Sequence, residues 1–237
     1  MTAVLAVQVP GLYAADTSVP LIRDRSPAIV SVRCTGDIHS SGKRPAGPGG
    51  LADLLLTTGK ARTVRYARTG GGVIIDPKGI IVTNDHIVRD AGEVFVTFFN
   101  GKQVPVELVY ALPDVDIAIL CVKPPFPLSY IPLANSDKVP VGAKVYAIGH
   151  SMTHDKTIFR GKISGIAIAP VSGNFRRTFL TAVFGRHLFS GDSGSPLLDK
   201  KGYLVGLISA GRRDGDKATL AVASNLIRDA YRNILPY

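Results

Sequence analysis

Short apolar runs rich in valine and isoleucine, cut by glycine and proline, recur along nearly the whole chain. Turn signals such as Pro77-Lys78-Gly79 and Asn100-Gly101 separate successive runs. The 25 glycines and 16 prolines among 237 residues favour short strands and tight turns over long helices. The sequence therefore predicts an all-β protein.

The predicted strands form two sets of about six each. They span 29–34, 72–76, 80–83, 93–99, 104–110 and 116–122 in the first set, and 143–148, 156–169, 178–183, 196–198, 203–209 and 219–223 in the second. Glycines divide the run over 156–169 into strand, turn and strand. A proline-rich linker over 124–133 separates the sets, and only residues 225–234 have helical spacing. We predict two antiparallel six-stranded β-barrels, over 26–123 and 134–237, the second ending in a C-terminal helix.

Two segments fall outside this pattern. Residues 36–72 hold 11 glycine or proline residues among 37 and predict a long loop, either functional or a tolerated surface insertion. Residues 1–15 are apolar and end in small side chains, like the second half of a secretory signal peptide, but lack its basic start. Residues 1–25 are therefore either a truncated export signal or a packed N-terminal arm. The first alternative, which we favour, predicts a periplasmic or secreted protein.

Composition excludes several classes of protein. The formal net charge is +10, but the basic residues are scattered, so no specific nucleic-acid partner is expected. No apolar run approaches the 18 or more residues of a transmembrane helix. Cys34 and Cys121 each lie in an apolar run and are compatible with buried thiols, whatever the compartment. An oligomer is compatible with the sequence.

The run Gly191-Asp192-Ser193-Gly194-Ser195-Pro196 is the strongest chemical signal. A serine hydroxyl is a weak nucleophile, so it needs a neighbouring base and donors for the developing oxyanion. Flanking glycines allow a tight turn that exposes the hydroxyl. Ser193 is therefore a candidate nucleophile.

Two further segments supply candidate partners for this serine. His86 comes just after an apolar strand, and Asp116 opens another apolar strand, where an unpaired acid would be costly. An aspartate that accepts from the far ring nitrogen of a histidine fixes its tautomer. Asp114 is the rival for this role.

These three segments, in the order His, Asp, Ser, resemble the trypsin-fold serine proteases, and the closer likeness is to the bacterial HtrA (Deg) branch. The segments from Gly71 to His86, from Val115 to Leu120 and from Leu220 to Asn225 are similar to landmarks of that branch. The likeness covers roughly residues 26–230.

The resemblance implies a serine endopeptidase acting on protein or peptide substrates, with His86 as base, Asp116 as its orienter and Ser193 as nucleophile. It also implies an oxyanion hole from the backbone N–H groups of Gly191 and Ser193. Substrate would bind through the edge of Ser209, Ala210 and Gly211 and a specificity pocket near His187, Leu188 and Phe189. Leu188 and Phe189 favour small or medium apolar side chains, whereas His187 favours acidic ones, and the sequence leaves both open. No cofactor or metal is implied.

The chain departs from the HtrA branch at several points. Asp192 replaces the usual asparagine and needs a partner or exposure. We also expect this sequence to lack the PDZ domain that is common in that branch.

Two other functions are alternatives to a serine protease. The segment Gly149-His150-Ser151-Met152-Thr153 resembles the nucleophile elbow of an α/β-hydrolase, but Thr153 replaces the required glycine and no βαβ alternation follows. A catalytically silent trypsin-fold module that binds peptides or acts as a chaperone is the other alternative.

Overall fold

The structure is a computed structural model that describes residues 18–40, 62–149, 157–170, 176–184, 190–211 and 218–234. Its first part is a seven-stranded antiparallel sheet with the order β5-β4-β1-β2-β3-β7-β6. The strands are β1 Ile29–Ser40, β2 Arg62–Asp76, β3 Ile80–Thr83, β4 Glu93–Thr97, β5 Gln103–Pro105, β6 Leu108–Leu112 and β7 Ile117–Cys121. β1 and β2 form a long hairpin that pairs from Ile29 opposite Val73 to Ser40 opposite Arg62.

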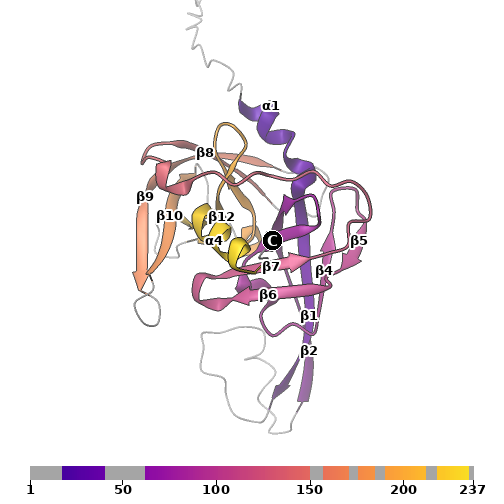
Figure 1. Ribbon diagram of the computed structural model, residues 1–237. Coiled ribbons are helices and arrows are strands. Elements are labelled where there is room, and N and C mark those ends of the chain that lie inside the picture. The colour runs from indigo at the N-terminus through magenta and orange to yellow at the C-terminus, as the bar shows by residue number, and fades with distance from the viewer. Residues whose placement is uncertain are drawn as a thin grey trace, which may run out of the picture.

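The second part is a closed barrel with the order β10-β13-β12-β11-β8-β9. Its strands are β8 Lys144–Ile148, β9 Ile158–Pro170, β10 Arg176–Phe184, β11 Pro196–Leu198, β12 Leu204–Gly211 and β13 Ala218–Ala223. Figure 1 shows the barrel beside the sheet, with β9 and β10 on the side away from β4 and β5.

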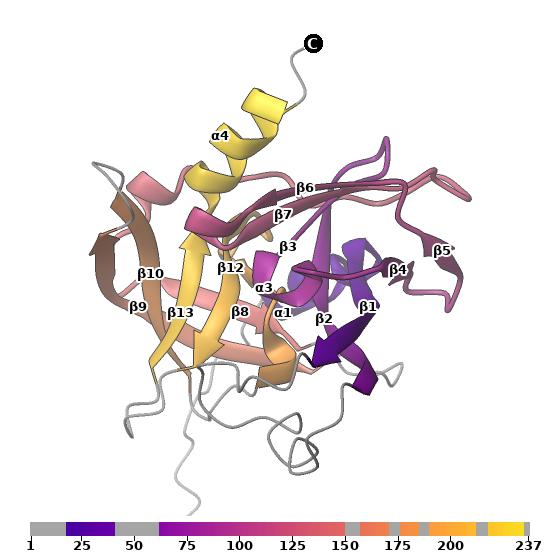
Figure 2. The ribbon, with the colours of Figure 1, turned by 90° about the horizontal axis from the view of Figure 1, so that it is seen from below.

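Helices are short and few in the described part of the chain. They are α1 Ser18–Arg23, α3 Asp85–Val88 and α4 Ser224–Ile234, with 3-10 turns η1 Ser26–Ala28, η2 Pro113–Val115, η3 Ser136–Lys138 and η4 Ser190–Asp192. Figure 2 shows α4 projecting beyond the barrel and α3 between the two sets of strands. Among the described residues, no helix is both long and apolar enough to cross a membrane.

The two parts share a hydrophobic core. The larger apolar cluster runs from sheet residues such as Val73 and Ile81 to barrel residues such as Tyr146 and Leu207, and on to Ile227 of α4. A second cluster, which includes Leu180 and Val205, fills the barrel. Because burial of apolar surface is the main force that stabilises folds, this continuous core fixes the sheet and the barrel relative to each other.

The prediction of two antiparallel β units with a terminal helix is confirmed, but the first unit is an open sheet. The strand predicted over 104–110 bends at Val106 and Glu107. Its first half, β5, pairs with β4, and its second half, β6, pairs with β7. One bent segment therefore joins both edges of the sheet and curls it without closing a ladder between them.

Two local predictions were wrong. The run over 156–169 is a single strand over its described part, because the ladder with β10 absorbs one extra residue at Ser164 as a bulge instead of a turn. The long loop predicted over 36–72 is in part strand, since β1 continues to Ser40 and β2 begins at Arg62. Its centre, 41–61, and the predicted signal segment over 1–15 lie outside the described residues.

The fold also excludes the α/β-hydrolase hypothesis. β8 pairs antiparallel with both β9 and β11, whereas a nucleophile elbow needs a parallel sheet and a following helix. Ser151 itself lies outside the described residues.

Candidate active site

His86 lies on α3, the one-turn helix that follows β3. The apolar residues of β3 are buried, so the strand ends inside the molecule. The turn that follows it therefore lies at the junction of the sheet and the barrel. Asn84 precedes the turn in an extended conformation, and its side-chain amide donates to the carbonyl of Asp116 at 3.1 Å. The strand end and this contact bring His86 next to the start of β7.

Asp116 is a buried acid at the start of β7. Its backbone is left-handed, with φ 54°, a conformation that is uncommon for residues other than glycine but more frequent for aspartate and asparagine. This turn directs the carboxylate away from the apolar strand and toward α3. Asp114, the rival acid, is exposed on η2.

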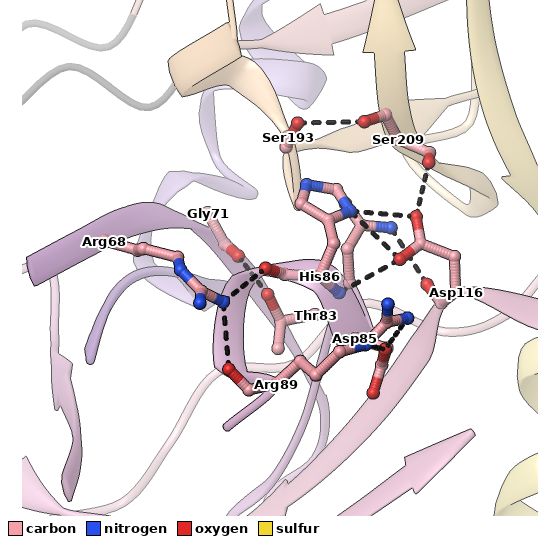
Figure 3. A network of polar contacts seen from close by, with 10 residues as sticks. Arg68, Gly71, Thr83, Asp85, His86, Arg89, Asp116, Ser193 and Ser209 are labelled. Atoms are coloured by element: carbon pink, nitrogen blue, oxygen red, sulfur yellow. Dashed lines mark hydrogen bonds and ion pairs between the residues drawn. The ribbon is translucent and has the colours of Figure 1, made fainter. Parts of the chain in front are cut away.

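His86 and Asp116 form a paired unit. The Nδ1 of His86 lies 2.9 Å from Oδ1 and 3.1 Å from Oδ2 of Asp116, and the His86 backbone N–H donates to Oδ1 at 3.1 Å. Because Nδ1 faces carboxylate oxygens, it is the ring nitrogen that carries the proton in the neutral imidazole, and Nε2 is then the nitrogen with the lone pair. Figure 3 shows Nε2 on the side of the ring nearer to Ser193.

Ser209 supports Asp116 from the barrel. Its hydroxyl on β12 donates to Oδ2 of Asp116 at 2.5 Å. Burial alone would raise the pKa of Asp116, but hydrogen bonds from His86 and Ser209 outweigh it, so this pKa lies below its ordinary value. The carboxylate is thus ionised and fully bonded beside the imidazole.

Ser193 follows η4 and is buried, and its hydroxyl donates to the carbonyl of Ser209 at 2.9 Å. Ser193 just after η4, His86 on α3 and Asp116 just before β7 lie at the junction of the sheet and barrel, where Ser209 links Ser193 to Asp116 (Figure 3). Gly191 lies exposed in η4, close to Ser193 in the chain. Asp192 is half-buried.

The predicted substrate edge is only partly described. Ala210 and Gly211 pair with Leu220 and Thr219 of β13. The register between β11 and β12 ends at Leu207, so within the described residues Ala210 and Gly211 have a strand partner on one side only, and the β12–β13 register skips Ser209. His187, Leu188 and Phe189 lie outside the described residues.

Sequence reasoning missed the role of the Ser209 hydroxyl, which it assigned to the substrate edge. A polar side chain at the end of the apolar run over 204–208 is the signal that was available. It also missed Thr83, whose hydroxyl donates to the Gly71 carbonyl at 2.7 Å. Cys34 and Cys121 are free thiols, and burial raises the pKa of each.

Comparison with known families gives this geometry its context. Residues 70–207 match the family described as trypsin-like peptidase domain, and this range contains His86, Asp116 and Ser193. The chain belongs to the trypsin-like peptidase family.

Relatives within the peptidase family are HtrA-type proteases. The chain is 26% identical over 222 residues to the periplasmic pH-dependent serine endoprotease DegQ of Escherichia coli, covering 92% of this chain and 48% of DegQ. It is 29% identical over 185 residues to the periplasmic serine endoprotease DegP of the same organism, covering 76% and 38% of the two chains. It therefore spans less than half the length of these two relatives.

Solved structures agree on the fold. The HtrA-type protease AlgW with a decapeptide superposes with a TM-score of 0.69 at 20% identity, over 93% of this chain and 68% of AlgW. AlgW with a tripeptide gives 0.70 at 21% identity, over 92% and 63%. The similarity extends over both the sheet and the barrel.

Proposed function

We propose that this protein is a serine endopeptidase in which His86 is the general base, Asp116 orients it and Ser193 is the nucleophile. The observation that carries the proposal is the His86–Asp116 pair, in which Asp116 bonds Nδ1 and Nε2 lies on the side of Ser193. Rotation of the Ser193 hydroxyl from the Ser209 carbonyl toward Nε2 completes the relay. Membership of the peptidase family supports the same assignment.

The reaction follows from these groups. The Ser193 oxygen attacks the carbonyl carbon of the scissile peptide while its proton passes to Nε2 of His86. The backbone N–H groups of Gly191 and Ser193 stabilise the oxyanion. Protonated His86 then donates its proton to the leaving amine, and water, deprotonated by His86, hydrolyses the acyl-enzyme. Asp116 stays ionised and stabilises the imidazolium throughout.

The substrate class follows from the edge over 209–211. An extended peptide adds to such an edge as a further strand through main-chain hydrogen bonds. In a folded helix or an internal strand, the main-chain groups are already bonded and cannot pair with this edge. We therefore propose unfolded segments of exported proteins as substrates. The periplasmic location named for DegQ and DegP supports export of this chain.

Incubation with an unstructured protein, followed by mass spectrometry of the products, tests this function. The wild-type protein should release peptides, whereas Ser193→Ala and His86→Ala should release none while remaining folded. Ser195→Ala is the matched control, because the buried Ser195 hydroxyl in the same loop makes no hydrogen bond in the described part of the chain. Binding of the unstructured protein without cleavage by the wild type would support the silent peptide-binding module instead.

A further inference from the structure

The turn that carries His86 is held by contacts outside itself. α3 is only four residues long, and a helix this short is not stable on its own. Asp90, two residues beyond α3, has a positive φ of 59°. The position of the His86 backbone must therefore come from neighbouring elements.

Side chains of the β1–β2 hairpin bind the carbonyl groups of this turn. The same nitrogen of Arg68, Nη1, donates to the carbonyls of His86 at 3.1 Å and Arg89 at 2.9 Å. The Cys34 thiol donates to the Ile87 carbonyl at 2.9 Å, and the Tyr66 hydroxyl donates to the Asp90 carbonyl at 2.6 Å. Four carbonyls between residues 86 and 90 thus have partners on one hairpin.

The hairpin is arranged to place Arg68. Cys34 and Arg68 are direct cross-strand partners, so their side chains share the face that meets α3. The Arg68 guanidinium lies over the Tyr66 ring, 4.6 Å from its centroid. Gly36 lies opposite Tyr66, and a Cβ there would come within 2.6–2.8 Å of the tyrosine ring and hydroxyl. Glycine at position 36 therefore leaves room for Tyr66, and Tyr66 in turn supports Arg68.

Arg68 and Asp116 hold opposite ends of the same residue. Asp116 accepts from the backbone N–H of His86, and Arg68 donates to its carbonyl (Figure 3). Of the two, only Asp116 also bonds the imidazole. Arg68 therefore acts on the ring through the main chain.

We propose that Arg68 is a positioning residue that fixes the His86 backbone so that the imidazole stays between Asp116 and Ser193. This inference rests on the proposed function, in which His86 is the base. Small displacements of a catalytic group are costly: about 1 Å of misplacement lowers rates by roughly 100-fold.

Arg68→Ala tests the proposal, with Arg65→Ala as the matched control. Arg65 lies on the same strand, is largely exposed and, within the described part of the chain, forms only a 3.5 Å ion pair with Asp37, so its loss should leave activity near the wild-type value. Arg68→Ala should lower kcat by about 10- to 100-fold with little change in KM. A soluble guanidinium compound should partly restore kcat in Arg68→Ala, because it can replace the missing donor. Equal kcat in the two variants would overturn the proposal.

Proton NMR separates this inference from the proposed function. The proton between His86 Nδ1 and Asp116 should give a far-downfield resonance, which we expect to weaken or shift in Arg68→Ala and to persist in Arg65→Ala. This signal does not require hydrolysis, so it tests the positioning role even if the wild type releases no peptides. If Arg68→Ala unfolds, Arg68→Lys keeps the aliphatic stem and a donor group at its end, and it should show a smaller change of the same kind. An unchanged resonance in a folded Arg68 variant would contradict the proposal.

Discussion

Gly71 and Ser193 meet main chain to main chain at the junction of the sheet and the barrel. The Gly71 N–H donates to the Ser193 carbonyl at 2.7 Å, and the Thr83 hydroxyl donates to the Gly71 carbonyl at 2.7 Å. On the barrel side, the Gly194 N–H donates to the Ile208 carbonyl at 2.8 Å. The turn that carries the candidate nucleophile is therefore anchored to β2 and β12 on either side.

Gly194→Ala should disrupt this anchoring. Gly194 has a φ of 81°, and a Cβ there would lie 2.0 Å from the Gly71 carbonyl oxygen. We expect peptide hydrolysis to fall by at least about 100-fold and the free energy of unfolding to fall by more than about 2 kcal/mol. Enzyme assays and urea unfolding provide the two measurements.

Gly142→Ala separates steric clash from backbone strain in that experiment. Gly142 has a similar φ of 86°, but nothing lies within 4 Å of a Cβ built there. It should lose about 1 kcal/mol of stability and keep its activity. If Gly142→Ala and Gly194→Ala behaved alike, the contact with Gly71 would not be what holds the turn.

Ser209→Ala should make the protein more sensitive to acid. The pKa of Asp116 is lowered in the folded protein, so its ionised form contributes stability above the ordinary pKa that is lost as pH falls through the folded value. Removing the Ser209 hydrogen bond raises that folded pKa, so unfolding should begin at a higher pH. Circular dichroism during acid titration measures this shift.

Ser164→Ala is the control for that titration. The Ser164 hydroxyl bonds Thr181 on the barrel surface at 3.1 Å, far along the chain from Asp116. Its acid midpoint should match that of the wild type. An unchanged midpoint in Ser209→Ala would mean that the Ser209 contact does not stabilise ionised Asp116.

Tyr231→Phe should lower the free energy of unfolding near neutral pH, because it removes a hydrogen bond between α4 and the sheet. The loss should shrink at strongly alkaline pH. The Tyr231 hydroxyl donates to Asp76 at 2.8 Å, and burial followed by this hydrogen bond raises the pKa of Tyr231 to about 12. The raised pKa means that the contribution is complete below about pH 10 and is lost as pH rises toward 12. Urea unfolding at pH 8 should show a loss of about 1 kcal/mol that shrinks at pH 11. A difference that stays constant between these pH values would contradict the assignment.

The sequence predicted the elements that depend on local pattern. Apolar runs bounded by glycine and proline identified most strands, and the polar residues His86 and Asp116 stood out because they border buried apolar strands. Pairing of these two residues could be expected, since a buried acid requires a partner. The family resemblance then assigned these two residues their roles beside Ser193.

Features that depend on pairing between distant strands were not predictable in the same way. The polar outer half of the β1–β2 hairpin has the composition of a loop, and its strand conformation comes from the ladder between 36–40 and 62–66. The bend at Val106 depends on two different partner strands. Arg68 lies in the segment that the sequence predicts as a loop, and its contact with α3 depends on the β1–β2 pairing.

Covalent labelling with a fluorophosphonate probe, located by peptide mapping, tests the proposed activity most directly. The probe reacts only with a serine whose hydroxyl is activated by a neighbouring base. We predict stoichiometric labelling of Ser193 in the wild type and in Ser195→Ala, and none in Ser193→Ala or His86→Ala. Absence of label from folded wild-type protein, or equal labelling after loss of His86, would contradict a hydrolase built on these residues.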